Sequence, residues 1–231
     1  MQLADKLLEI IGSDYNCISI TGAGGKTTLL TLLASAYRAQ GKSVLITTTT
    51  KIQSPKLFDF SQDIYFLNER DVLMHEVKKG EVVFFSDLHI MDPKKCVAPR
   101  KEILDILLPR YDVVLIEADG AKCLPLKMHT DRDPVMLKQT TATIAVMGSS
   151  AYGLKGDNVC FGFDSDKTVD KEFFQMLIDD EYGVFKDVCG NKRILLINQC
   201  DISPYEELKG LKLPDGYSLI FGSEKENKLY E

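Results

Sequence analysis

Residues 16–40 read NCISITGAGGKTTLLTLLASAYRAQ, and this stretch decides the fold. Residues 16–21 have the β-branched and apolar content of a strand, and residues 27–40 have the apolar spacing of a helix that ends before Gly41. A glycine-rich turn joins the two segments. A strand that passes through a short loop into a helix is the opening unit of an α/β fold.

The remainder of the chain alternates short β-branched runs with longer helical stretches, which is the pattern of an α/β fold with a mainly parallel sheet. Further strands are expected at residues 43–46, 64–67, 81–85, 111–116, 143–147, 193–197 and 217–221. Helices are expected at residues 3–11, 99–108 and 171–179, with another near residues 204–208. Residues 148–167 have weak periodicity, so we expect a long surface loop there.

The composition is that of an ordinary globular protein and excludes several functions. The chain has 231 residues, of which 45% are hydrophobic and 27% charged, and its net charge is -6 at pH 7. No basic tract stands out, so nucleic acid is not an expected partner. No apolar run approaches the ~20 residues that span a bilayer, and Asp5, Lys6 and Glu9 lie close to the N-terminus, so we expect a cytoplasmic protein that does not bind membranes. The six cysteines are scattered and are interpreted as reduced.

The loop between the first expected strand and helix carries the sharpest chemical signal. It consists of Gly22, Ala23, Gly24, Gly25, Lys26, Thr27 and Thr28. Glycines let consecutive backbone amides point at phosphate oxygens, a lysine reaches the β- and γ-phosphates, and the next hydroxyl ligates Mg²⁺. The full Walker A pattern has another glycine where Ile20 stands, so this loop is a shortened version similar to the compact loop of the Mur ligases. A glycine turn with an exposed lysine is the alternative interpretation.

A second acidic site is expected near such a loop, because the metal and the attacking water must be directed. Residues 111–116 run directly into Glu117-Ala118-Asp119-Gly120, at the carboxyl end of the strongest expected strand. Glu117 or Asp119 is expected to hold Mg²⁺, directly or through water, and the other to orient water. Together with Thr27 as metal ligand and Lys26 as catalytic lysine, they predict a three-layer P-loop NTPase-like domain over residues 1–231. The alternative interpretation is that Glu117 and Asp119 are solvated acidic residues of a loop.

Two further segments follow expected strands. Residues 47–51 read TTTTK and are expected either to approach the γ-phosphate, as switch segments do, or to extend the strand. Residues 198–201 read NQCD, similar to the Asn-Lys-x-Asp sequence with which P-loop GTPases recognise guanine. Asn198 and Asp201 are therefore expected to bind the base, and GTP is slightly favoured over ATP, although Gln199 replaces the usual lysine. His129 is a weaker candidate, and it is considered because it lies in the segment after the acidic pair.

Taken together, GAGGKTT, TTTTK, EADGAKCLPLK and Asp133-Pro134 resemble the YqeC family, the accessory proteins of selenium-dependent molybdenum hydroxylases. The four motifs lie in order between residues 20 and 140. The resemblance implies a P-loop NTPase-like fold and a role in maturing a molybdenum enzyme. It also implies a client protein of that maturation pathway as a partner.

Two classes of function remain open from the sequence. In the first, the protein is an enzyme that hydrolyses a nucleoside triphosphate, or a Mur-ligase-like enzyme that activates a small acid with ATP. In the second, it is a nucleotide-binding switch or chaperone whose slow hydrolysis times release from a client. Both classes require Mg²⁺ and a nucleoside triphosphate, either GTP or ATP.

Overall fold

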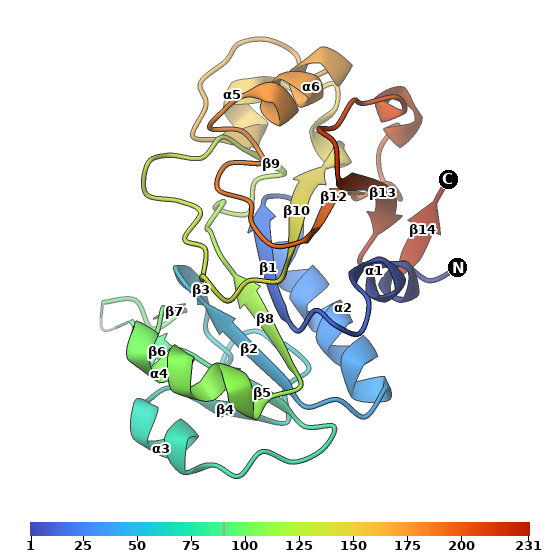
Figure 1. The fold of residues 1–231 in the computed structure, drawn as a ribbon. Coiled ribbons are helices and arrows are strands. Elements are labelled where there is room, and N and C mark those ends of the chain that lie inside the picture. The colour runs from blue at the N-terminus through green and yellow to red at the C-terminus, as the bar shows by residue number, and fades with distance from the viewer. Residues whose placement is uncertain (90) are drawn as a thin grey trace.

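The computed structural model describes residues 1–89 and 91–231, and its centre is a nine-stranded sheet (Figure 1). In spatial order the strands are β14 (Lys228–Tyr230), β13 (Tyr217–Ser223), β12 (Lys192–Asn198), β10 (Ala142–Gly148), β1 (Cys17–Gly22), β8 (Val113–Glu117), β2 (Val44–Thr48), β5 (Val82–Phe85) and β4 (Ile64–Phe66). Every neighbouring pair is parallel except β13 with β14. The expected α/β class with a mainly parallel sheet is confirmed.

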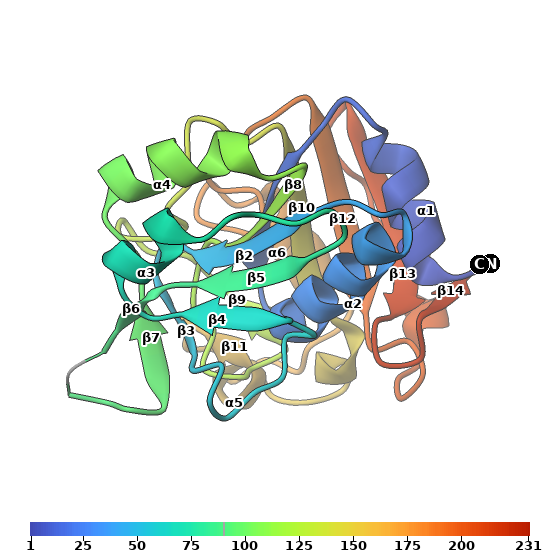
Figure 2. The same ribbon diagram turned by 90° about the horizontal axis from the view of Figure 1, so that it is seen from below.

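Helices cover both faces of this sheet, which gives three layers (Figures 1 and 2). On one face lie α1 (Leu3–Ile11) and α2 (Lys26–Ala39), which share a buried cluster with β1, β2, β5, β8, β10 and β12. On the other face lie α3 (Glu69–Met74) and α4 (Lys101–Leu107) over one half of the sheet, and α6 (Lys171–Asp179) over the other. The bounds of α1 and α6 agree with the expected helices at residues 3–11 and 171–179.

The side chains of the central strand β1 alternate between the two faces of the sheet, so this strand packs against both helical layers. Ile18 and Ile20 of β1 pack with the cluster that holds α1 and α2, whereas Cys17 packs with the cluster that holds α4. Successive side chains of a strand point to opposite faces, so a strand between two helical layers must be apolar on both sides. All six residues of β1 are accordingly buried.

Residues 148–167, expected as a long surface loop, are more ordered than that. They contain a 3₁₀ turn, η2 (Ser149–Ala151), the short helix α5 (Gly156–Val159) and strand β11 (Cys160–Phe161), which pairs with β9 (Leu126–Lys127). Their apolar residues pack onto α6 without any repeat along the chain, so periodicity could not reveal them. Near residues 204–208 the chain forms only a 3₁₀ turn, η3 (Tyr205–Leu208), preceded by Pro204.

A second, antiparallel sheet of three short strands lies beside the carboxyl edge of the main sheet. Its order is β3 (Lys51–Gln53), β7 (Lys95–Val97) and β6 (Asp87–Leu88). The threonine run therefore divides, because Thr47 and Thr48 end β2 while Lys51 begins β3. In the described part of the chain, no helix has both the length and the apolar character needed to cross a membrane.

Candidate functional site

The carboxyl ends of β1, β8 and β12 meet at one edge of the sheet, and the expected phosphate loop lies there between β1 and α2. Gly22 and Gly24 have φ angles of 87° and 84°, which L side chains rarely adopt. A Cβ on Gly22 would also overlap the carbonyl oxygen of Val146 in the next strand. Ala23 is buried and donates its amide to that same carbonyl at 2.9 Å. The loop is thus packed directly onto β10, which fixes its path.

Lys26 folds back over the loop. Its side chain is 6% exposed, its Nζ donates to the carbonyl of Gly22 at 2.6 Å, and it lies 3.0 Å from Asp119 Oδ1. The lysine–aspartate contact is an ion pair, and Asp119 Oδ1 has no other donor among the described residues. Burial acts to lower the pKa of Lys26, but the carboxylates of Asp119 and Glu117 outweigh it and raise that pKa. Lys26 therefore stays charged at the mouth of the loop.

Thr27 and Glu117 form a hydroxyl–carboxylate pair one residue further along. Thr27 Oγ1 donates to Glu117 Oε2 at 2.9 Å, with Glu117 at the last position of β8. Burial raises the pKa of the Glu117 carboxyl, while Lys26 and the Thr27 hydrogen bond act in the opposite direction. Oxygen ligands of these two kinds suit Mg²⁺. In the described residues no three His, Cys, Asp or Glu side chains are grouped to hold a metal, so phosphate and water oxygens would have to complete such a site.

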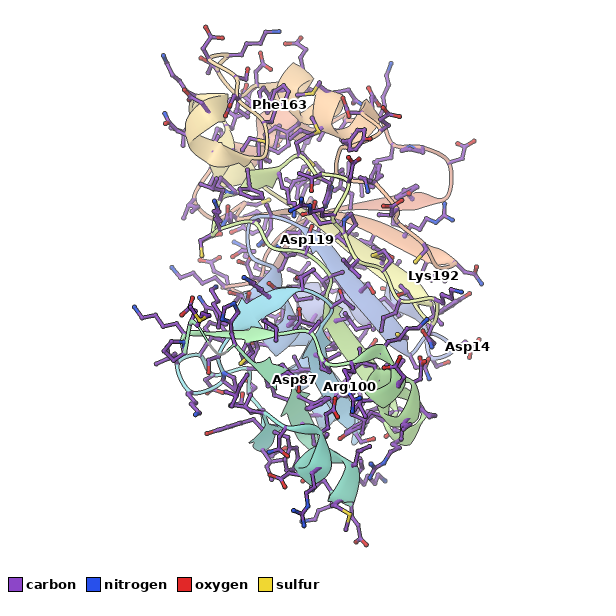
Figure 3. All side chains as sticks on the ribbon, turned by 90° about the vertical axis from the view of Figure 1, so that its left-hand side faces the viewer. Asp14, Asp87, Arg100, Asp119, Phe163 and Lys192 are labelled. Carbon is purple, nitrogen blue, oxygen red and sulfur yellow. The ribbon has the colours of Figure 1, made fainter. Side chains whose placement is uncertain are left out.

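Asp119 lies deeper and is fully enclosed (Figure 3). Its Oδ2 accepts the amide of Gly22 at 2.9 Å, lies 2.7 Å from His129 Nε2, and is 3.4 Å from Lys127 Nζ. Burial alone would raise the pKa of Asp119, but Lys26, His129 and Lys127 hold it well below its ordinary value. In this structure the carboxylate contacts protein groups, and its expected role in holding metal or water stays a prediction.

Sequence reasoning missed Lys127 as a site residue and treated His129 as a weak candidate. Lys127 is buried and donates to the carbonyl of Gly120 at 2.6 Å, and it also pairs with Asp133. His129 Nδ1 lies 2.7 Å from the carbonyl oxygen of Gly183, so both ring nitrogens face oxygen acceptors. No local sequence pattern predicts such a cluster, because its members come together only when β9 folds back over the loop.

On the other side of the loop, Asn198 links β12 to the loop and to Glu224. It ends β12, is fully buried, donates Nδ2 to the carbonyl of Gly24 at 2.7 Å and accepts the amide of Glu224 at 3.0 Å. Gln199 has a φ of 65° and accepts the hydroxyl of Ser150 at 2.5 Å. The carboxylate of Asp201 is half-buried and takes part in none of the hydrogen bonds or ion pairs of the described residues. Only Asn198 of the expected base-binding pair touches the phosphate loop.

Glu224 is a further residue that the sequence did not single out. It is 9% exposed, and a Cβ on Gly25 would overlap its Oε1. Burial raises the pKa of the Glu224 carboxyl to about 7, aided by the charge of Asp201, and its Oε2 has no hydrogen-bond partner among the described residues. A buried carboxylate with one unpaired oxygen thus lies against the glycine loop on the side of β13.

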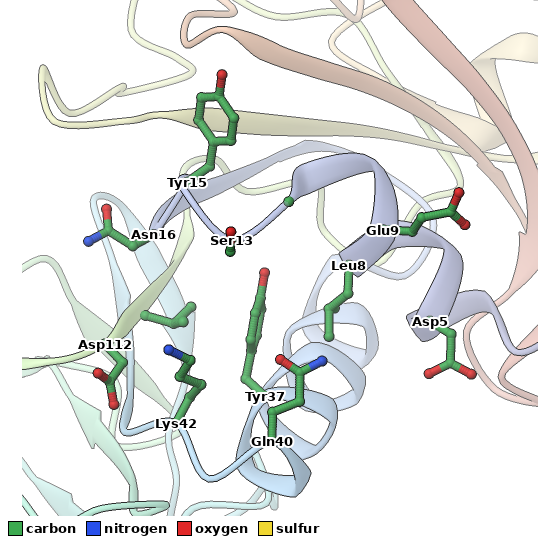
Figure 4. A pocket seen from close by; sticks show the side chains of 12 residues that line it. Asp5, Leu8, Glu9, Ser13, Tyr15, Asn16, Tyr37, Gln40, Lys42 and Asp112 are labelled. Carbon is green, nitrogen blue, oxygen red and sulfur yellow. The ribbon is translucent and has the colours of Figure 1, made fainter.

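One pocket lies at the site and another lies away from it. The first, of about 280 Å³, lies over the loop, and most of its lining comes from residues 24–28, 120–124 and the small sheet. Thr28 is exposed at its edge. A second pocket of about 410 Å³ lies between α1 and α2 (Figure 4), where Asn16, Lys42 and Asp112 precede β1, β2 and β8. That pocket is at the opposite edge of the sheet and contains none of the expected site residues.

Comparison with known proteins agrees with the motifs. Residues 18–164 match the family model described as YqeC protein. A protein of Escherichia coli (strain K12) described as "Uncharacterized protein YqeC" is 32% identical over 228 residues, covering 91% of this chain and 88% of its own length. No solved structure gives a significant match. By its family model and by this relative, the chain belongs to the YqeC family.

Proposed function

We propose that this protein binds a nucleoside triphosphate with Mg²⁺ at residues 22–28 and hydrolyses it, with residues 1–231 forming one P-loop NTPase-like domain. One observation carries the proposal. A glycine loop opens a helix of 14 residues, and the charged Lys26 and the Thr27–Glu117 pair converge at its mouth. The helix N-terminus and the loop amides favour an anion at this position.

The chain's own groups have distinct roles in this proposal. Thr27 and Glu117 fit a magnesium ion, Glu117 directly or through water, because a hydroxyl and a buried carboxylate are hard oxygen ligands. Mg²⁺ would neutralise charge on the phosphates. Lys26 meets the charge that develops on the transferring phosphoryl group. We assign Asp119 to positioning, since it holds Lys26 and the amide of Gly22 in place.

For the base we propose guanine ahead of adenine. Asp201 accepts hydrogen bonds, guanine offers two donor groups on one edge, and adenine does not match that pattern. The carboxylate of Asp201 is free of ion pairs in the described residues, and Asn198 links the strand that precedes it to the phosphate loop. Gln199, which stands where GTPases have lysine, makes this preference a small one.

The cellular role that we propose follows from the family. The resemblance to accessory proteins of selenium-dependent molybdenum hydroxylases supports a maturation factor that acts on a client protein of that pathway in the cytoplasm. A nucleotide-controlled switch with little intrinsic hydrolysis is the second candidate. It is supported by the bond from Thr49 Oγ1 to the carbonyl of Val135 at 2.6 Å, which joins the loop after β2 to the segment between β9 and β10.

The proposal is tested by a thermal-shift screen of ATP, GTP, CTP and UTP, each with Mg²⁺ and with EDTA. At about 100 times Kd, ligand linkage adds about 2.7 kcal/mol to the free energy of unfolding, or a Tm rise on the order of 5 to 10 °C. We expect this rise with at least one purine triphosphate and a smaller rise in EDTA. The absence of a shift with every triphosphate at millimolar concentration would contradict the proposal.

A further inference from the structure

The small sheet of β3, β7 and β6 presents a polar face beside the phosphate loop. Ile52 and Cys96 are paired across β3 and β7 and are buried on the core side. Side chains alternate along a strand, so Lys51, Gln53 and Lys95 share the opposite face. Gln53 and Lys95 are direct partners in the register. All three line the pocket over the phosphate loop.

These three side chains have no partners of their own. Within residues 1–89 and 91–231, the amines of Lys51 and Lys95 and the amide of Gln53 make no hydrogen bond or ion pair. Gln53 and Lys95 are half-buried, so their polar groups face a confined space that is open to a ligand. Phe58 also lines the pocket, where its ring gives an apolar wall.

The charged lining of the pocket is mainly positive. It consists of Lys26, Lys51, Lys95, Lys122 and Glu117. Lys26 is already paired with Asp119, which leaves three lysines facing the carboxylate of Glu117. The phosphates are met by Lys26, the loop amides and the helix N-terminus. Lys51 and Lys95 belong to the small sheet and not to the loop, so they can bind a second anion, since like charges held together in a cleft attract a counter-ion.

The position of these lysines separates them from the base. In the sheet order, β2 and β12 lie on opposite sides of β1, each with one strand between. Asn198 ends β12, whereas Lys51 and Lys95 belong to the small sheet that follows β2. Lys51, Lys95 and Glu117 line the same pocket. The two lysines therefore lie on the side of the site where Glu117 ends β8, away from β12.

We propose that Lys51, Gln53 and Lys95 bind the oxyanion of a second small substrate, a carboxylate or a phosphate, next to the γ-phosphate of the bound nucleotide. The two ammonium groups and the amide donate hydrogen bonds to its oxygens, and Phe58 contacts its carbon skeleton. This inference rests on the proposed function, because it places the second anion relative to a nucleotide on residues 22–28. It implies that a small molecule, as well as water, lies next to the γ-phosphate.

The test measures oxyanion binding on top of nucleotide. Wild-type protein is saturated with Mg²⁺ and a non-hydrolysable triphosphate and titrated with inorganic phosphate in one arm and acetate in the other, each against sodium chloride of equal ionic strength. Calorimetry gives the affinities, and the two arms separate phosphate from carboxylate. The double variant Lys51→Ala/Lys95→Ala is compared with Lys56→Ala/Lys94→Ala, which removes the same charge from exposed neighbouring positions.

We expect at least one oxyanion to bind the nucleotide-loaded wild type and the control, and to bind the Lys51→Ala/Lys95→Ala variant roughly tenfold or more weakly. The nucleotide affinity of that variant should fall by a much smaller factor than its oxyanion affinity. Equal oxyanion binding by all proteins, or none by the wild type, overturns the inference. A comparable loss of nucleotide affinity in the variant also overturns it, because the lysines would then belong to the γ-phosphate.

The same titrations separate this inference from the proposed function. If the wild type binds no triphosphate, the proposed function fails, and the oxyanion titration is repeated on the free protein. Binding that is lost in Lys51→Ala/Lys95→Ala but kept in the control would then still support an anion site on the small sheet. Binding that is indifferent to these lysines would remove it.

Discussion

Around Asp119 the charged side chains of the proposed site are paired with one another, whereas at the base end Asn198 is bonded to backbone groups and Asp201 has no partner in the described residues. Asp119 gathers Lys26, Lys127, His129 and the amide of Gly22 around one buried carboxylate. Residues that are held in place before a ligand arrives lose little freedom on binding.

This difference teaches where substitutions should matter. A charge network in a buried site is costly to break at any single member, because the remaining charges are left without compensation. A half-exposed carboxylate next to water can be replaced at small cost. We therefore expect large effects at the phosphate end and small effects at the base end, and the following predictions test that ranking.

The largest effect is expected for Asp119→Asn without any ligand. The variant removes the negative charge between Lys26 and Lys127, and breaking a buried pair in this way costs about 3 kcal/mol or more. Urea unfolding measures it, with exposed Asp131→Asn as the control, which should stay within about 0.5 kcal/mol of the wild type. Equal stability of the two variants would mean that the charge network around Asp119 does not stabilise the fold.

The next effect is the loss of triphosphate binding in Lys26→Ala. Lys26 supplies the charge at the mouth of the loop, so its removal should weaken Mg²⁺-triphosphate binding roughly 100-fold, about 2.7 kcal/mol. The thermal shift on adding triphosphate should then disappear. Lys101→Ala, at an exposed position of α4, should keep the full shift. A preserved shift in Lys26→Ala would place the nucleotide elsewhere.

Glu224→Gln probes the buried carboxylate between the two ends. The folded state raises the pKa of Glu224 from 4.5 to about 7, so its stabilising effect is complete below pH 4.5 and is lost as pH rises to about 7. The variant should remove this dependence and be more stable than the wild type at pH 8 by about 2 kcal/mol. Denaturant midpoints at pH 5 and pH 8 measure it, with exposed Glu226→Gln as the control. Parallel pH profiles of wild type and Glu224→Gln would refute the assignment.

A smaller effect is expected for catalysis in Glu117→Gln. Loss of the carboxylate next to Thr27 should lower kcat about tenfold or more, about 1.4 kcal/mol, with nucleotide affinity changed less. Its apo stability should not fall, because burial already disfavours the charged form of Glu117. Steady-state phosphate release is compared with that of Glu102→Gln, an exposed residue of α4. Wild-type turnover in Glu117→Gln would remove this residue from the metal site.

The smallest effect is expected for Asp201→Asn at the base end. The GTP-to-ATP affinity ratio should fall by a few-fold, less than about 1 kcal/mol, since this half-buried carboxylate competes with water. Competition binding with a fluorescent nucleotide gives the ratio. An unchanged ratio would remove Asp201 from base recognition. Asn198, which bonds to the carbonyl of Gly24, would then be the remaining residue of the pair at the site.

Several features of the fold could be predicted from the sequence for local reasons. Helices at residues 3–11 and 171–179 agree with α1 and α6, because amphipathic spacing marks the buried side of a helix. The expected main-sheet strands are also present, since parallel strands read as short apolar runs. The strands β3, β6, β7, β9, β11 and β14 were missed, because each has only two or three residues and is stabilised by pairing with another strand.

The candidate site divides in the same way. Gly22, Lys26, Thr27 and Glu117 were predicted from spacing alone, and the structure brings them to one edge of the sheet. Asp119 was predicted as a metal or water residue; in the structure it contacts protein groups, and that role stays a prediction. Lys127 and Glu224 were missed as site residues, since a charged residue after a strand is usually solvated and nothing local distinguishes these two.

By itself the sequence determined the strand, glycine loop and helix of residues 16–40, because hydrogen bonding and hydrophobic periodicity act over a few residues. It also determined the family, through four motifs in order. Only the tertiary structure decided that Asp119 holds Lys26, that Glu224 lies against Gly25, and that Lys51 and Lys95 face the phosphate loop. These pairings join elements far apart in the chain, and charges interact according to distance in space.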